Sequence, residues 1–260
     1  MEFVTRLQPV LLGLLFMTSS LVGCISDSQE EGEITLIVQF ERTNGTILES
    51  YMDGSLVSTT SSIIRFDFSQ TISERELVKF GIDIPNNGIE ISVNSDESST
   101  IEVEFTEHGI HDLVAYVMDN KGNQALLPIV IRMNLRMEWT ESGTYEPSPL
   151  TIDPFPANGG TSASSILIDS IVENPNLIEN IGGGRDVEIT WKLVDEQEDA
   201  CQNRNEVVSE GETVRWQTIH FNTFEIHELQ VDYNEGQDLI DVYQTVIIQY
   251  PELESVPNQE

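Results

Sequence analysis

The side chain with the best-defined chemistry in this sequence is the thiol of Cys24, because of the residues that precede it. An apolar run from Leu11 to Val22 leads into the tetrapeptide Leu21-Val22-Gly23-Cys24, which has the form of a lipobox. The run is about a dozen residues long, and crossing a bilayer takes roughly 20. We therefore expect a signal peptide cleaved after Gly23, a diacylglyceryl group on Cys24 and attachment to the extracytoplasmic face of the cell membrane. An ordinary signal peptide with a chance cysteine and an uncleaved anchor are the alternatives.

Four histidines are the next candidates, since imidazole is a common ligand of zinc. His108 and His111 lie three residues apart, as many zinc ligands do, and the other two are His220 and His227. Side chains three apart on a strand point to opposite faces of its sheet, so His108 and His111 are poorly placed to share a metal. We expect His111 and His227 to tie down a strand corner, as a tyrosine does in many β-sandwiches.

Two acidic segments are candidates for Ca²⁺, which takes about 6 to 8 oxygen ligands. Their candidate ligands are Asp119, Asn120 and Asn123 in the first segment, and Asp195, Glu196 and Asp199 in the second. Neither segment has EF-hand or RTX spacing, so a hairpin turn or a solvated acidic face is the favoured interpretation. No other cofactor is expected.

Cys201 and Asn44 each allow two interpretations. Lipidation of Cys24 would leave Cys201 as the one free thiol and exclude an intrachain disulfide. The acidic neighbours of Cys201 should raise the pKa of its thiol and disfavour a nucleophilic role, so we expect a small loop residue; an intermolecular disulfide is the alternative. Asn44-Gly45-Thr46 is a glycosylation sequon or a plain turn.

The rest of the composition argues against several functions. The chain has 45 acidic and 12 basic residues and a formal net charge of −33. No two basic residues are adjacent, which excludes duplex DNA as a partner, because neutralising phosphates takes clustered Lys and Arg. G-x-S-x-G, H-E-x-x-H and P-loop motifs are absent from the sequence, and so many acids make any close carboxylate pair uninformative. We therefore do not expect an enzyme.

Beyond residue 33, apolar residues alternate with polar ones, which is the period of half-buried strands. The clearest runs are 34–40, 89–93, 101–105 and 187–193, and turn-forming clusters separate them. This pattern predicts an all-β sandwich protein. Residues 25–33, ISDSQEEGE, are polar and acidic and should form a flexible tether.

A short internal repeat predicts two tandem domains. Ile110-His111-Asp112-Leu113 returns as Ile226-His227-Glu228-Leu229, and Val130-Ile131 returns at the same offset as Val246-Ile247. We expect a signal peptide over 1–23, a lipidated tether over 24–33, sandwich domains over 34–133 and 134–250, and a disordered tail over 251–260. The proline-rich segment 145–165 should be a long loop or an edge excursion, because proline cannot donate in a central ladder.

Two stretches of the first domain resemble a known family. Residues 64–83, IRFDFSQTISERELVKFGID, resemble the opening of a polycystic-kidney-disease-type (PKD) immunoglobulin-like module, in which an F-D-x-S turn leads to a W-D-F-G strand. Residues 108–131 resemble the ending of the same module. Phe80-Gly81-Ile82-Asp83 stands in place of the tryptophan strand, and Asn87-Gly88 replaces the usual Asp-Gly pair. In the second domain only residues 225–248 are similar. The resemblance implies immunoglobulin-like sandwiches that act as spacers, adhesion modules or modules that bind carbohydrate or protein.

These observations predict a lipid-anchored surface protein that acts as a non-catalytic binding, adhesion or structural module. Its partner would be an unidentified surface protein or glycan. We expect recognition by loops 145–163 and 195–206 at the far end of the second domain, because binding residues concentrate on loops held by a rigid scaffold. The alternative is an accessory subunit of a membrane-bound hydrolase or transporter, and an enzyme would need a cleft with desolvated carboxylates.

Overall fold

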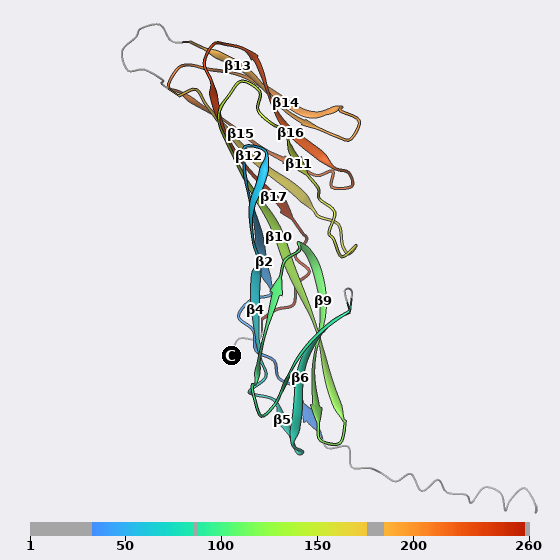
Figure 1. Cartoon of the computed structure of the whole chain (residues 1–260). Coiled ribbons are helices and arrows are strands. Elements are labelled where there is room, and N and C mark those ends of the chain that lie inside the picture. The colour runs from blue at the N-terminus through green and yellow to red at the C-terminus, as the bar shows by residue number, and fades with distance from the viewer. Residues whose placement is uncertain (1–32, 86–87, 176–184, 258–260) are drawn as a thin grey trace, which may run out of the picture. The chain divides into compact units, whose positions relative to one another are not determined.

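All regular structure in the described part of the protein is β-strand, as the alternating apolar residues predict (Figure 1). The computed structural model describes residues 33–85, 88–175 and 185–257, so the predicted signal peptide with Gly23 and Cys24 lies outside it. The strands assemble into sheets that share a buried core, and the predicted all-β sandwich class is confirmed. Among these described residues, no helix has the length and apolar character needed to cross a membrane.

The first half of the described chain contributes to one large sheet and builds two small two-stranded ones, β1 with β5 and β4 with β8. In the large sheet β10 pairs with β9, β9 with β6 and β6 with β7, all antiparallel, while β2 lies parallel to β10 and carries β3. The buried side chains of β4 and β8 join the same core. The bounds are β1 (Ile34–Thr35), β2 (Asn44–Met52), β3 (Ser55–Thr60), β4 (Ser62–Asp67), β5 (Ile72–Ser73), β6 (Leu77–Ile84), β7 (Ile89–Asn94), β8 (Thr100–Phe105), β9 (Gly109–Asp119) and β10 (Gln124–Thr144).

The second half has the strand order of a jelly roll. One sheet runs β15-β12-β17-β10 and the other runs β11-β16-β13-β14. If β10 is counted as the first strand, these orders are 6-3-8-1 and 2-7-4-5, the arrangement of two Greek keys in a jelly roll. The strands after β10 are β11 (Leu150–Ile152), β12 (Ser165–Glu173), β13 (Val187–Val194), β14 (Ala200–Val208), β15 (Thr213–His220), β16 (His227–Glu235) and β17 (Ile240–Gln249).

This connectivity differs from the immunoglobulin-like order that the sequence repeat led us to expect for residues 134–250. After the first histidine segment, β9 and β10 pair directly with one another. After the second, β16 pairs with β13 and β11, whereas β17 pairs with β10 and β12 in the other sheet. The repeat reflects which positions are buried, and burial alone does not determine the partner strand. The short β11 at a sheet edge agrees with the edge excursion expected within residues 145–165.

One strand, β10, belongs to both halves. Its residues 124–133 pair with β9, and its residues 135–144 pair along the same edge with β17. β2 pairs with residues 132–140 on the opposite edge and so spans the change of partner. Where the partner changes, Oδ1 of Asn134 accepts a hydrogen bond from the backbone N–H of Tyr250 at 3.0 Å, directly after β17 ends. The boundary predicted after residue 133 therefore falls inside a strand, and residues from Ile34 onward cluster as one unit. The division into two domains stays a prediction.

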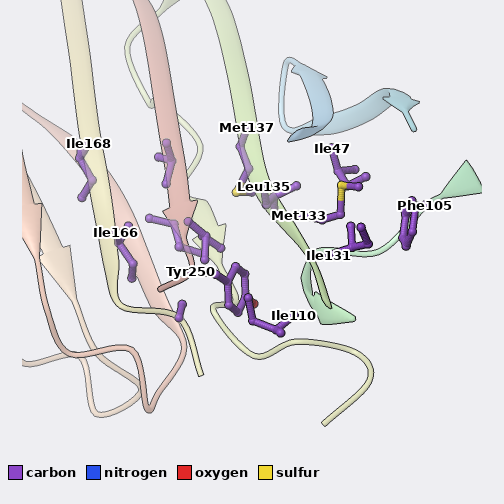
Figure 2. Packing of buried hydrophobic residues seen from close by; sticks show 14 of the residues in the cluster. Ile47, Phe105, Ile110, Ile131, Met133, Leu135, Met137, Ile166, Ile168 and Tyr250 are labelled. Atoms are coloured by element: carbon purple, nitrogen blue, oxygen red, sulfur yellow. The ribbon is translucent and has the colours of Figure 1, made fainter. Parts of the chain in front are cut away.

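The buried face of β10 is continuous through this junction. Every odd-numbered side chain from Ile129 to Trp139 is buried, and the alternation keeps all of them on one face of the strand. Figure 2 shows Ile131, Met133, Leu135 and Met137 following one another along β10. A single cluster of buried apolar residues joins them to the cores of both halves.

The tail after β17 returns to the first half instead of forming the disordered segment predicted from residue 251. Ser255 exchanges two hydrogen bonds with the backbone of Val130, at 3.0 and 2.9 Å. β2 covers β10 only from Arg132 onward, so the tail supplies partners for an edge that β2 leaves open. Beside it, the Glu254 carboxylate accepts hydrogen bonds from Nε and Nη2 of Arg132, at 2.8 and 2.5 Å. Residues 258–260 lie outside the described part.

The ion pair between Arg132 and Glu254 yields the first prediction. Glu254→Gln should lower the free energy of unfolding by about 1–3 kcal/mol, because hydrogen bonds to a charged group are lost from a largely buried pair. Arg132 holds the pKa of Glu254 below its usual value. The contribution is therefore complete above the unfolded-state pKa of about 4.3 and is lost as pH falls through the lower folded-state pKa. Urea unfolding at neutral pH and at about pH 3 measures both effects.

The control is Glu138→Gln, since Glu138 forms an exposed pair with Arg136. This change should alter stability by about 0.5 kcal/mol or less. Equal losses in the two variants at neutral pH would contradict the role assigned to the tail.

Candidate functional site

The two predicted Ca²⁺ segments form the same kind of hairpin turn. In each, Oδ1 of the leading aspartate accepts the backbone N–H groups two and four residues later, at 2.8 and 2.9 Å for Asp119 and at 2.9 and 3.0 Å for Asp195. The fourth residue of each turn has a positive φ, +86° at Gly122 and +64° at Glu198. The aspartates therefore hold the turns closed through their side chains.

Asp119 is much more deeply placed than Asp195. Its side chain is 1% exposed, Oδ2 accepts Nδ2 of Asn123 at 2.8 Å, and the guanidinium of Arg75 lies 3.7 Å away. Burial raises the pKa of Asp119, but the hydrogen bonds from Asn123 and Lys121 outweigh it and hold the pKa below the usual value. A Ca²⁺ ion would have to displace these donors. The amide of Asn120 donates instead to Glu76, at 3.4 Å.

Parts of the predicted recognition segments, residues 153–163 and the turn 195–199, lie at the end of the jelly roll that adjoins the first half, not at its far end. Residues 153–158 contact the first half directly, because Nδ2 of Asn158 donates to the carbonyl oxygen of Ile110 at 2.8 Å. Tyr250 links both halves, since its Oη lies 2.8 Å from Nδ1 of His108 and 3.3 Å from the carbonyl oxygen of Pro154. The start of the proline-rich segment lies elsewhere, where Tyr145 donates to the carbonyl oxygen of Gln237.

A further loop, residues 221–226, lies between the two predicted segments. Thr223 donates to the carbonyl oxygen of Ala163 at 2.6 Å, and the N–H of Ile226 donates to Oε1 of Glu196 at 3.3 Å. This loop exposes two large aromatic side chains, Phe221 and Phe224, each 71% exposed. Of the predicted loop 195–206, only the first part is a turn, because residues from Ala200 onward belong to β14 at the edge of its sheet.

Three side chains that can ligate a metal meet at the same end. Cys201 lies near the start of β14, His220 ends β15 and His227 begins β16. Each offers a ligand atom within 4.8 Å of the others, and the two imidazole rings meet edge to face with centroids 4.6 Å apart. The thiol is exposed, His220 is partly buried and His227 is 0% exposed. We call these three residues the Cys-His-His cluster.

Each histidine of the cluster has one buried ring nitrogen without a hydrogen-bond partner. Nε2 of His227 lies 2.9 Å from the carbonyl oxygen of Asn222, and Nδ1 has no partner. In His220, Nδ1 lies 3.5 Å from the amide nitrogen of Gln202, and Nε2 has no partner. His111 offers the comparison, since its Nε2 lies 3.0 Å from the carbonyl oxygen of Glu107 in a similar corner contact. Both corner histidines thus make the backbone contact expected of them, and of the two it is His227 that lies in a group of three possible metal ligands among the described residues.

Burial favours the neutral form of His220 and the protonated thiol of Cys201. Burial lowers the pKa of His220, and the adjacent His227 lowers it further. Burial also raises the pKa of the Cys201 thiol, and the carboxylates of Asp195 and Glu225 add to this effect. The cluster therefore places nitrogen and sulfur donors close to the negative charge of Asp195 and Glu225, which is the setting of a cation site.

The sequence contains a partial signal for the cluster that spacing alone does not reveal. Cys201 and His220 occupy mirrored positions about the turn at 209–212, which joins β14 to β15. Gln202 donates to the carbonyl oxygen of Ile219 at 3.1 Å, so the two strand ends do meet. The third member, His227, comes from a strand whose place is set by the jelly-roll order, and the repeat predicted another order.

The remaining predicted residues have ordinary surroundings. Asn44 is exposed at the start of β2, and its amide donates to Oε1 of Glu254 at 3.3 Å. A shallow groove of about 500 Å³ next to it is lined by Arg42, Ser62 and Asn134, among others. Two further carboxylates are buried, and each accepts a hydrogen bond. The backbone N–H of Ser148 donates to Glu141, and the guanidinium of Arg185 donates to Asp238.

Comparison with known proteins gives structural similarity only. No family model matches the sequence, and no curated protein matches it. One similar solved structure is of carbohydrate-binding modules from the β-sandwich superfamily, with a TM-score of 0.30 and 9% identity over 84% of this chain and 98% of that chain. Bacteroides uniformis β-glucuronidase 2 has a TM-score of 0.29 and 8% identity over 84% of this chain and 30% of its own. A Bacteroides ovatus protein of a mixed-linkage glucan utilization locus has a TM-score of 0.21 and 12% identity over 77% and 52%. At these scores the likeness carries no conclusion about function.

The paired turns provide a matched test of the aspartates. Asp119→Ala should lower the melting temperature by several degrees, because it leaves buried donors without their acceptor, and Asp195→Ala should lower it clearly less, because that turn is exposed. Thermal unfolding of both variants measures the difference. Melting with and without added Ca²⁺ tests the cation in the same samples: a rise in the wild-type protein that either variant abolishes would show that Ca²⁺ binds at that turn.

Proposed function

We propose that this protein is anchored by lipid at the extracytoplasmic face of the cell membrane and acts there as a non-catalytic binding or structural module. The observation that carries the proposal is the tetrapeptide Leu21-Val22-Gly23-Cys24 at the end of an apolar run too short to span a bilayer. The polar segment 25–33 then separates the anchor from a unit that begins at Ile34. Such a leader and a β-sandwich unit suit a protein that works outside the cytoplasm.

We further propose that residues 34–133 are a module of the PKD type. The strand order β10-β9-β6-β7 corresponds to G-F-C-C′ of an immunoglobulin-type sandwich, and β4 with β8 corresponds to the opposite sheet. Phe80, which stands where the PKD family has tryptophan, is 5% exposed and stacks on Phe68 with ring centroids 5.1 Å apart. The smaller ring thus fills the core position in which sandwiches of this type bury tryptophan.

Binding would use the loop end that carries residues 221–226. Phe221 and Phe224 are strongly exposed on a loop whose backbone is held by Thr223 and Ile226. Large apolar side chains exposed on a held loop favour contact with a partner. Acidic residues flank them, so a surface protein or a glycan suits this end better than an anionic partner.

Mass spectrometry of the mature amino terminus tests the anchor. We expect a chain that starts at Cys24 and carries a diacylglyceryl modification, and we expect Cys24→Ser to release the protein from membranes, because the acyl chains supply the membrane affinity. Cys201→Ser is the matched control and should remain membrane-bound. An unmodified chain with another amino terminus would contradict the proposal.

Substitution of the exposed phenylalanines tests the binding surface. Phe221→Ser with Phe224→Ser should change stability by about 0.5 kcal/mol or less, since both side chains are exposed. The same change should remove the cross-links that the anchored protein forms with other components of the cell envelope. Leu126→Ser, at another exposed apolar side chain (63% exposed), is the control and should leave the cross-links unchanged. Identical cross-linking in the double variant would show that binding occurs elsewhere.

A further inference from the structure

The Cys-His-His cluster has the donors of a transition-metal site. One sulfur and two imidazole nitrogens are borderline-soft ligands, which suit zinc and its neighbours in the first transition row and not Ca²⁺ or Mg²⁺. The donors come from three consecutive strands, near the start of β14, at the end of β15 and at the start of β16. They lie within 4.8 Å of one another although no disulfide or mutual hydrogen bond among them is recorded in the described residues.

The two unpartnered nitrogens are the second, independent observation. Burying a polar atom without a partner is costly, and such atoms are few in the described structure. Two of them, Nε2 of His220 and Nδ1 of His227, belong to this one cluster. A cation between the nitrogens and the thiolate would supply the missing partner for both.

His227 is already oriented as a ligand. Its Nε2–H donates to the carbonyl oxygen of Asn222 at 2.9 Å, which places the proton on Nε2 and leaves the lone pair on Nδ1. Histidine ligands commonly donate their second ring N–H to a backbone carbonyl in this way, because the contact fixes the tautomer. His220 requires more adjustment, since its Nδ1 must be protonated and Gln202 lies beside it at 3.5 Å.

The spacing fits a tetrahedral ion after a small movement. Ligand atoms at about 2.0–2.3 Å from zinc lie roughly 3.3–3.8 Å from one another. The cluster thus needs its side chains to close by about 1 Å, and the exposed side chain of Cys201 can make most of that movement. Asp195 and Glu225 act electrostatically on the thiol and would equally attract the cation.

We propose that Cys201, His220 and His227 bind one zinc-class divalent cation, with the fourth coordination position open to solvent. The ion would join the ends of β14, β15 and β16 and hold the base of the loop 221–226. Binding transfers the thiol proton to solvent and forms a thiolate–metal bond, with no change of oxidation state. The site depends on the jelly roll and not on the lipid anchor, so it can fail or succeed independently of the proposed function.

Cobalt titration of the full-length chain, purified in detergent, reduced and freed of metal, tests the proposal. We expect one equivalent of Co²⁺ to bind with a thiolate charge-transfer band and the visible bands of a tetrahedral ion, and one equivalent of Zn²⁺ to remove both. Cys201→Ser should lose the charge-transfer band and bind the ion at least about 100-fold more weakly. Loss of a group that only hydrogen-bonds to a metal ligand already lowers metal affinity by about 10–100-fold. His220→Asn should weaken binding similarly.

Two controls keep the result interpretable if a variant unfolds. Cys24→Ser should keep the full cobalt spectrum, because the other cysteine is not a ligand in this proposal. In the wild-type protein, Zn²⁺ should slow alkylation of Cys201 and Ca²⁺ should not.

Three results would overturn the proposal. The first is folded wild-type protein that binds no Co²⁺ or Zn²⁺ at stoichiometric concentrations. The second is a cobalt spectrum that Cys201→Ser leaves unchanged. The third is a dimer that reductant dissociates, formed through Cys201 in protein that binds no ion, which would instead establish the thiol as an intermolecular disulfide.

Discussion

The side-chain alternation of β10 constrains the rest of this structure. A strand has a side-chain period of two, so a slip of one residue would turn every buried side chain toward solvent. The odd positions of β10 stay buried from Ile129 to Trp139, although the partner along one edge changes from β9 to β17 at Asn134. Because the phase is kept through that change, the cores of both halves must lie on the same face of β10. One cluster of buried apolar residues is the result.

The edges of β10 explain how two different sandwich topologies join without a linker. On one edge, Asn134 caps the end of β17 through Tyr250. On the other, β2 pairs across the junction and the tail pairs with Val130 where β2 has not yet begun. Unpaired strand edges invite association with other chains, and here segments from both ends of the described chain cover them. The largely buried pair of Arg132 with Glu254 fixes the tail in this position.

How much of this could be predicted depended on whether the signal was local. Alternation identified strands such as 101–105 and 187–193, and turn-forming residues placed the turn at Asp119. Long-range pairing could not be predicted, because Ile110-His111 and Ile226-His227 have equal local patterns while their strands take different partners. The tail was misjudged for the same reason: its sequence is polar, and its order comes from partners more than 120 residues away. The Cys-His-His cluster likewise depends on strand order and not on spacing.

Because Cys201 is exposed, its thiol would be open to oxidation at the proposed extracytoplasmic location. Free thiols outside the cytoplasm tend to be oxidised, and an exposed cysteine without a partner is a site of disulfide exchange. Burial and the carboxylates around Cys201 raise its thiol pKa and so lower its reactivity, and the carboxylates also attract cations. Two nitrogens without partners lie beside it. A bound cation would engage the sulfur and both nitrogens at once, whereas a disulfide would engage the sulfur alone, and this difference is why the metal accounts for more of the observed geometry.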